Sequence, residues 1–182
     1  MTFTVVFFLL ILVLNSPVVQ TKLASHITNQ INKDYSTDIN VNQVAIGFKG
    51  DVLLKDVFIA DQREDTLFYA KNIKTDLNIL DQLLEGKFVL HNATLDGLYL
   101  RINQYEEDNS LKSFINKLNS KQNSKKKNKD LFIALDNLTI LDGKIINSNQ
   151  QDASKDYSIN NISLKATDFY LIGKEIEAQI VT

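Results

Sequence analysis

The segment "NATLDGLYLRI", residues 92–102, decides the fold because its apolar pattern changes phase half-way along. A β-strand turns successive side chains to opposite faces, so the apolar residues of one face keep either odd or even numbers. Here they are odd before the Asp96–Gly97 dipeptide and even after it, namely Ala93, Leu95, Leu98, Leu100 and Ile102. The pattern therefore predicts a bulge or bend at Asp96–Gly97.

Nearly the same phrase returns in "NLTILDGKIIN", residues 137–147, with Asp142–Gly143 in the corresponding place. A similar change of phase occurs near Lys55–Asp56, within "GDVLLKDVFIAD". We expect the two copies to be equivalent long strands of one sheet, with Gly97 and Gly143 marking the bend in each.

Composition excludes several classes of protein. A chain of 182 residues with a net charge of −2 is long enough for one domain and gives no reason to expect nucleic acid as a partner. There is no cysteine, so a disulfide framework, a thiolate nucleophile and a zinc finger are excluded. His26 and His91 stand far apart, without ligand-like neighbours. We expect no metal and no cofactor.

The sequence motifs of common enzyme classes are also missing. There is no glycine-rich phosphate loop, G-x-S-x-G, H-E-x-x-H or calcium loop. Aspartates recur at the expected strand bends, where Asp suits a turn better than a catalytic pair: Asp56, Asp61, Asp96 and Asp142. We therefore expect that the protein is not an enzyme and nominate no catalytic residue.

The first nineteen residues contain the strongly apolar run "TFTVVFFLLILVL". As a helix, residues 3–19 would rise about 26 Å, slightly less than the ~30 Å of a hydrocarbon core. No small-x-small cleavage site comes after it, so we interpret residues 1–19 as a membrane anchor in preference to the alternative, a signal peptide. No Lys or Arg precedes the run, so the flanking charges do not favour a cytoplasmic N-terminus.

Residues 17–33 are predicted to form an amphipathic helix. Ser16 is a suitable N-cap and Pro17 a suitable first helical residue. Apolar residues then recur at every fourth position, which gives a narrow stripe that would pack on the β-rich region: Val19, Leu23, Ile27 and Ile31.

Residues 38–182 have the period of two that is typical of β-strands, so this part is predicted to be a β-rich region. Helical spacing of apolar residues predicts short helices near 79–85 and at 109–119. Residues 119–130 form a polar, Lys-rich linker, which we interpret as a solvated loop. Because the chain stops while its residues still alternate, we expect it to be a fragment of a longer protein.

Four segments, taken in order, carry a resemblance to a known family: "PVVQTKLASHITNQINK", "INVNQVAIGFKGDVLLKDVFIAD", "DTLFYAKNIKTDLNILDQLLEGKFVLHNATLDGLYLRI" and "NSLKSFINKL". Within them the pattern rests on a few positions, namely Pro17, Gln20, Asp61, Asp65, Leu67, Ala70, Gly86, Asp96 and Gly97. The chain resembles the N-terminal region of the AsmA-like superfamily, and within it the TamB (translocation and assembly module) type found in Bacteroidetes-like bacteria. The resemblance covers nearly the whole chain. It departs at the anchor, which lacks the basic cytoplasmic flank usual in the family.

The resemblance implies a mostly β fold. A membrane-anchor helix and an amphipathic helix would precede a long, twisted antiparallel sheet, which forms an open apolar groove as the start of a bridge-like or chorein-like β-taco. The helix over 17–33 would cap the membrane end of that groove.

The resemblance also implies a location and partners. The protein would cross the bacterial inner membrane once, through residues 3–19, with its body in the periplasm. It would serve envelope biogenesis by transferring phospholipid or another lipid between the inner and outer membranes, by supporting outer-membrane protein assembly, or by both. A BamA-like outer-membrane barrel would be contacted by a C-terminal part that this chain lacks.

In this interpretation one face of the sheet lines the groove. Exposing a lipid chain to water costs ~0.8 kcal/mol per CH₂, or on the order of 13 kcal/mol for sixteen carbons, and an apolar trough removes most of this barrier without a catalytic residue. The candidate groove residues are Leu54, Val57, Ile59, Ile73, Leu77, Phe88, Leu90, Ala93, Leu95, Leu98, Leu100, Leu138, Ile140, Ile162, Leu164 and Phe169. The alternative function is a secreted or anchored β-sandwich or β-repeat binding module without lipid transport, in which the same residues form a closed core.

Overall fold

The structure, a computed structural model, describes residues 16–47, 50–76, 87–106, 108–120, 132–172 and 175–181. Residues 1–15 of the predicted anchor, the whole of the predicted helix near 79–85 and most of the predicted linker lie outside these ranges. Among the helices that are described, none combines the length and the hydropathy that crossing a membrane requires.

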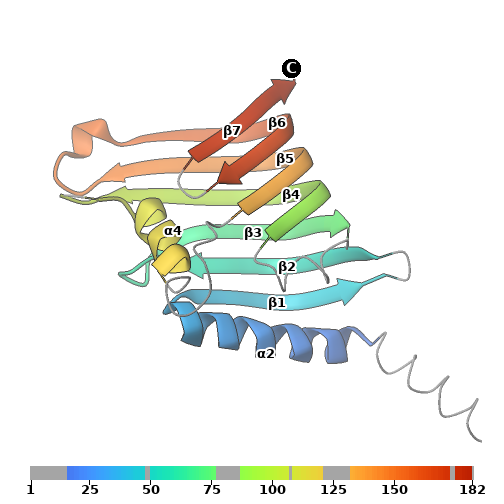
Figure 1. Ribbon diagram of the computed structural model, residues 1–182. Coiled ribbons are helices and arrows are strands. Elements are labelled where there is room, and N and C mark those ends of the chain that lie inside the picture. Colours follow the sequence, from blue (N-terminus) through green and yellow to red (C-terminus); the bar gives the residue numbers. More distant parts are fainter. Residues whose placement is uncertain are drawn as a thin grey trace, which may run out of the picture.

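The described chain is mostly β with an N-terminal helix, as the sequence predicts. Helix α2 (Pro17–Tyr35) comes first and agrees with the helix predicted over 17–33. Seven strands then form one sheet in chain order: β1 (Asp38–Ile46), β2 (Asp51–Ala60), β3 (Thr66–Asp76), β4 (Lys87–Gln104), β5 (Phe132–Asn149), β6 (Tyr157–Ile172) and β7 (Glu175–Val181). Figure 1 shows α2 lying along the β1 edge and β7 at the opposite edge.

The sheet is mixed, so the expectation of a wholly antiparallel sheet is wrong. Strands β4 and β5 pair in parallel, whereas the other neighbours are antiparallel. Parallel neighbours need a crossover connection of a dozen or more residues. Residues 105–131 provide it, and they include helix α4 (Ser110–Ser120), which contacts β4 and α2.

The parallel pairing explains why the same phrase occurs twice in the sequence. The two copies lie side by side in register, so that Asn92 pairs with Asn137, Thr94 with Thr139 and Leu95 with Ile140. Like residues therefore stack on like residues. The amide of Asn137 donates to the Asn92 side-chain oxygen over 3.2 Å.

Each change of phase predicted from the sequence is present as a local departure from regular strand geometry. Buried residues lie five positions apart in three neighbouring strands, a spacing that regular alternation would place on opposite faces: Val52 and Val57, Ala70 and Thr75, Ala93 and Leu98. Between them the backbone turns left-handed, with φ 49° at Asp56 in β2 and 63° at Gly97 in β4. Two consecutive residues then face the polar side, and the apolar residues stay on the other.

These two-residue steps align across β1 to β5, and the step of β6 at Asn160–Asn161 is displaced from that of β5; we call the line that they form the seam. The register pairs Gln43 with Lys55, Lys55 with Asn72, Asn72 with Asp96, and Asp96 with Leu141. The seam residues are exposed or half-buried: Asn42, Gln43, Lys55, Asp56, Lys71, Asn72, Asp96, Gly97, Leu141, Asp142, Asn160 and Asn161. A shorter second line crosses β4, β5 and β6 at His91–Asn92, Asp136–Asn137 and Thr167–Asp168, and Asp168 has φ 51°.

The two-residue steps occur in strands that are bent, and the sheet is curved. Bulges and left-handed residues bend a strand and increase its twist. Figure 1 shows β4, β5 and β6 changing direction along their length, so that one end of each strand turns out of the plane of β1–β3.

Helix α2 covers the edge of the sheet through polar side chains. An edge strand exposes unpaired N–H and C=O groups. Gln20 and Asn32 each engage both backbone groups of one β1 residue: Gln20 with Ile46 at 2.8 and 3.3 Å, and Asn32 with Ile39 at 2.8 and 2.8 Å. The Thr21 hydroxyl does the same with Val44 at 3.0 and 3.3 Å. Three side chains therefore replace a neighbouring strand.

Substituting Gly97 tests the seam. A Cβ at Gly97 would lie 3.0 Å from the Lys71 Cβ, and φ there is left-handed. We expect Gly97→Ala to lower the free energy of unfolding by about 1–2 kcal/mol in a urea titration. Gly47→Ala is the control, because its Cβ would find only ordinary contacts from 3.6 Å outward. Equal stability of the two variants would contradict the role assigned to Gly97.

Substituting Asn32 tests the edge cover. Asn32→Ala leaves both backbone groups of Ile39 without their side-chain partner, so we expect a loss of about 1–3 kcal/mol of unfolding free energy. Asn29→Ala, at an exposed position of the same helix, should be neutral. Size-exclusion chromatography should detect pairing of β1 edges in the Asn32 variant. Full retention of stability would show that α2 is held by other contacts.

Candidate functional site

The apolar residues of the sheet form continuous rows that run from strand to strand. Residues paired across neighbouring strands share a face, so the register defines each row. One row is Val44, Leu54, Ile73, Leu95, Ile140 and Leu164; a second is Ile39, Ile59, Phe68, Leu100, Ile145 and Ile159. Between them runs the row of Val41, Val57, Ala70 and Leu98, and on the far side lies that of Val52, Thr75, Ala93, Leu138 and Ala166.

The structure brings most of the predicted groove residues together in these rows. Val57, Ala93 and Leu98 are buried. Leu54, Ile59, Ile73, Leu95, Leu100, Leu138, Ile140, Ile162 and Leu164 are half-buried. Leu77 lies outside the described residues, and Phe88, Leu90 and Phe169 belong to described strands although their side chains lie outside the described part.

Sequence reasoning missed several members of the same rows. Val44, Val52, Phe68 and Ala166 lie in them, and Ala70 is fully buried at the centre of one. The signal was present, because Val44 and Val52 continue the alternation of candidates that were chosen. Small residues such as Ala70 and Ala166 carry little weight in an apolar pattern.

The bend in β5 differs in detail from the expectation. The left-handed residue is Asp142, with φ 50°, and the register places it beside Gly97. The register with β6 shifts on both sides of Gly143, so the strand is irregular at Asp142–Gly143 as expected, although its left-handed residue is Asp142. Gly143 is needed for space instead, because a Cβ there would lie 2.9 Å from the Ile140 Cγ2 and 3.2 Å from the Ile162 Cβ.

The other face of the sheet is polar and hydrogen-bonded along the seam. The Asp56 carboxylate accepts from the Tyr69 hydroxyl at 2.8 Å and from the Asn42 amide at 3.1 Å, and these bonds lower its pKa. The Asn72 amide donates to Asp96 at 2.9 Å. Asp56 and Asp96, two of the aspartates that the sequence placed at bends, thus accept hydrogen bonds from neighbouring strands.

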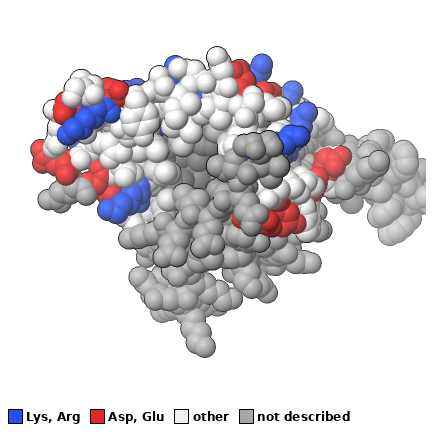
Figure 2. All heavy atoms as spheres, turned by 90° about the horizontal axis from the view of Figure 1, so that it is seen from above, with Lys and Arg blue, Asp and Glu red and all other residues white. Residues whose placement is uncertain are grey.

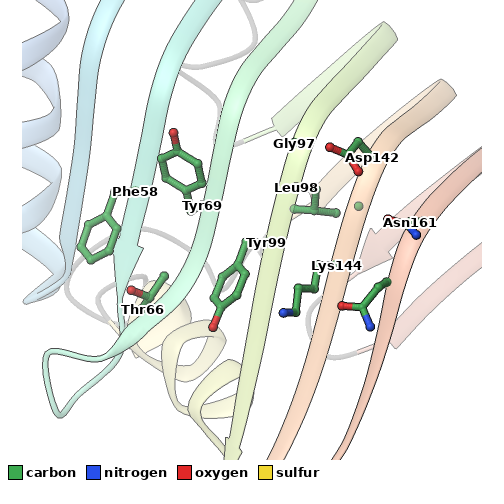
Figure 3. Close-up of a pocket in the computed structure, with 11 residues that line it drawn as sticks. Phe58, Thr66, Tyr69, Gly97, Leu98, Tyr99, Asp142, Lys144 and Asn161 are labelled. Atoms are coloured by element: carbon green, nitrogen blue, oxygen red, sulfur yellow. The ribbon is translucent and has the colours of Figure 1, made fainter.

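An open pocket of about 520 Å³ lies on this polar face. Aromatic residues from three strands line it, and Phe58 pairs with Tyr69, which pairs with Tyr99. Figure 3 shows the three rings on neighbouring strands, with Tyr69 displaced along the strands from the other two and with Lys144 beside Tyr99. The alternation of apolar residues gives no signal for this pocket, because it concerns only the apolar face of each strand.

A polar cluster around Asp61 closes one end of the sheet. Asp61 is 7% exposed and accepts from four donors: the Tyr105 hydroxyl at 2.7 Å, the Asn103 amide at 3.0 Å, and the backbone N–H groups of Arg63 at 2.8 Å and Asp65 at 3.0 Å. Burial raises the pKa of Asp61, but these hydrogen bonds outweigh it and the net pKa is lowered. A carboxylate held ionised by four donors is a poor proton acceptor, so the cluster is a structural anchor.

Arg63 ties this cluster to a distant part of the chain. Its guanidinium lies 4.3 Å from the centre of the Tyr105 ring and donates to Gln150 at 2.6 Å. The β2–β3 loop, the end of β4 and the β5–β6 turn are thereby joined. Burial and the neighbouring Asp61 raise the pKa of Tyr105 to about 12.

Charge is distributed without a dominant sign. Figure 2 shows charged side chains of both signs toward the ends of the face seen from above, with uncharged residues between them. Among the described residues there is no group of three or more His, Cys, Asp or Glu that would hold a metal ion.

Comparisons with known proteins give no assignment. No family model matches the sequence, and no curated protein matches it significantly. The resemblance to the AsmA-like superfamily therefore stays a prediction from the sequence pattern.

The Asp61–Tyr105 pair predicts a specific pH dependence of stability. Because the pKa of Asp61 is lowered in the folded protein, its contribution is present above ~3.9, where an unfolded Asp titrates, and is lost as the pH falls through the folded pKa. Because the pKa of Tyr105 is raised, its contribution is present below ~10 and is lost as the pH rises toward 12.

Tyr105→Phe should remove the alkaline loss and should move the acid loss to higher pH. It should also lower the unfolding free energy near neutral pH by about 1.5–3 kcal/mol, the usual range for a hydrogen bond to a charged group. Urea titrations from pH 2 to 12 would measure this. Tyr99→Phe leaves the Asp61 donors intact and should therefore keep both the acid and the alkaline loss of stability. If Tyr105→Phe left both losses unchanged, the pH dependence would not come from the Asp61–Tyr105 pair.

Proposed function

We propose that the apolar face of the sheet holds the acyl chains of lipids, in a bacterial envelope protein that transfers phospholipid between the inner and outer membranes. The observation that carries the proposal is the continuity of the apolar rows across six strands. Support of outer-membrane protein assembly, which the same family resemblance implies, would use the same face.

The size of the face suits an acyl chain. A row from β1 to β6 crosses five strand spacings of ~4.8 Å, about 24 Å in all. One leaflet of a ~30 Å hydrocarbon core is ~15 Å thick, so a whole chain fits along one row. Such a chain would lie perpendicular to the strands and would pass from one strand's side chains to the next.

Covering an acyl chain along this face requires no chemical reaction. Each CH₂ removed from water contributes ~0.8 kcal/mol, so a row that keeps a sixteen-carbon chain covered offsets on the order of 13 kcal/mol. Half-buried Leu and Ile side chains provide this cover along the face. The proposal is therefore compatible with the absence of recognisable catalytic motifs.

The arrangement of the described strands favours a groove over a sandwich. A β-sandwich buries the same kind of alternating residues between two packed sheets. Here the described strands belong to one sheet, and the α2 edge is covered by side chains and not by a further strand. A closed two-sheet core would need strands beyond those described.

Photocrosslinking tests the proposal directly. A photoreactive residue is placed at Leu95, in an apolar row, or at Thr94, which pairs with Lys74 on the polar face. The full chain is produced in a Gram-negative bacterium, and the adducts are identified by lipid mass spectrometry. We expect phospholipid adducts at Leu95 and none at Thr94. Protein–protein crosslinks at Leu95 without lipid would indicate a closed core and would overturn the proposal.

A matched pair of variants measures the affinity. Leu95→Asp places a charge within the row, and we expect about tenfold less lipid to co-purify, which corresponds to ~1.4 kcal/mol. Thr94→Asp adds the same charge on the polar face and should leave the lipid content unchanged. Circular dichroism checks that both variants fold. Equal lipid content in the two variants would contradict binding along this row.

A further inference from the structure

The polar face of the sheet carries a pocket that the proposed lipid function does not use. It is open, about 520 Å³ in volume, and lies over the seam. Gly97 and Gly143 form part of its lining, and the absence of a side chain at Gly97 hollows the surface beside Lys71. The steps that keep the other face apolar therefore create a concavity here.

One side of the pocket is built from aromatic rings. Phe58, Tyr69 and Tyr99 are half-buried and come from β2, β3 and β4. The Tyr69 hydroxyl donates to Asp56, which fixes the position of that ring. Figure 3 shows the rings on neighbouring strands. Rings held in this way offer flat apolar faces and lose little side-chain freedom when they bind.

The other side of the pocket is built from exposed hydrogen-bonding groups. Asp142 and Lys144 come from β5 and Asn161 from β6, and all three are exposed. Together they offer a carboxylate acceptor, an ammonium donor, and an amide that both donates and accepts. One carboxylate and one ammonium cancel in formal charge, so the lining favours an uncharged ligand rich in hydroxyl groups.

We propose that this pocket binds a neutral saccharide. The C–H face of a sugar ring would stack on Tyr99 and Tyr69, and its hydroxyl groups would bond to Asp142, Lys144 and Asn161. Flat rings on one side and mixed donors and acceptors on the other suit a molecule that has one apolar and one polar face. A phosphate or a strongly anionic polymer would meet the Asp142 carboxylate.

Calorimetric titration of the full chain with soluble neutral sugars tests the proposal, using an N-acetylglucosamine trimer and a maltose trimer as probes. We expect one of them to bind, and Tyr99→Ala to weaken that binding about tenfold or more. Absence of heat with both trimers at millimolar concentration would overturn the proposal, and the rings would then serve only as cross-strand packing.

A second set of variants separates binding from folding. Asp142→Gly and Asn161→Gly remove the polar groups yet tolerate the left-handed backbone, with φ 50° and 55° at these positions. We expect each to weaken binding severalfold while the protein stays folded. Asp168→Gly is the matched control, since it has φ 51° in the same strand as Asn161 but lies outside the pocket lining. Equal binding by all three variants would place the sugar elsewhere and refute the site.

Discussion

The structure depends on keeping one face apolar along strands that bend. A strand of ten to eighteen residues that alternated regularly and then curved would carry its apolar residues out of one surface. The two-residue steps at Asp56, Gly97 and Asp142 reset the alternation at the same level in neighbouring strands, and the step at Asn161 in β6 is displaced from that of β5. Because the steps of β1 to β5 are aligned, the register survives them. Between β5 and β6 the register shifts around Gly143 and then returns, so the rows of apolar residues continue from strand to strand on both sides of the seam.

The same constraint sets the residue types at the seam. A left-handed backbone favours Gly, Asn and Asp, and these are the residues found there. Their side chains then face the polar side, where Asp56 and Asp96 accept hydrogen bonds from neighbouring strands. The edge at β1 has a different requirement, because the outward-facing N–H and C=O groups of this strand lack a strand partner. Helix α2 supplies that partner through Gln20, Thr21 and Asn32, and the sheet is thereby closed on this side without a further strand.

Much of this fold could be read from the sequence, because alternation and its interruption are local. The steps near Asp56 and at Asp96–Gly97 and the helix from Pro17 were predicted at nearly their observed positions. The parallel pairing of β4 and β5 was not, because it depends on where residues 105–131 carry the chain. The role of Asn32 was missed for a related reason: a polar residue beside an apolar stripe reads as solvated until the neighbouring strand edge is known. The bend at Asp142–Gly143 was predicted, but the left-handed residue within it was not, because an Asp-Gly pair permits a left-handed residue at either position.

The sequence predicted the apolar rows on one face but not the aromatic pocket on the other, and the nature of the two faces explains the difference. The apolar rows consist of many interchangeable side chains. The alternation of apolar residues alone therefore predicts them, and no single residue is indispensable. The aromatic pocket depends on a few residues from five strands that only the register brings together. Both arise from the seam, which turns Leu and Ile to one side and leaves Gly97 beneath the hollow on the other. A sheet that keeps one side apolar thus acquires, through the same backbone geometry, a shaped polar surface on the other side.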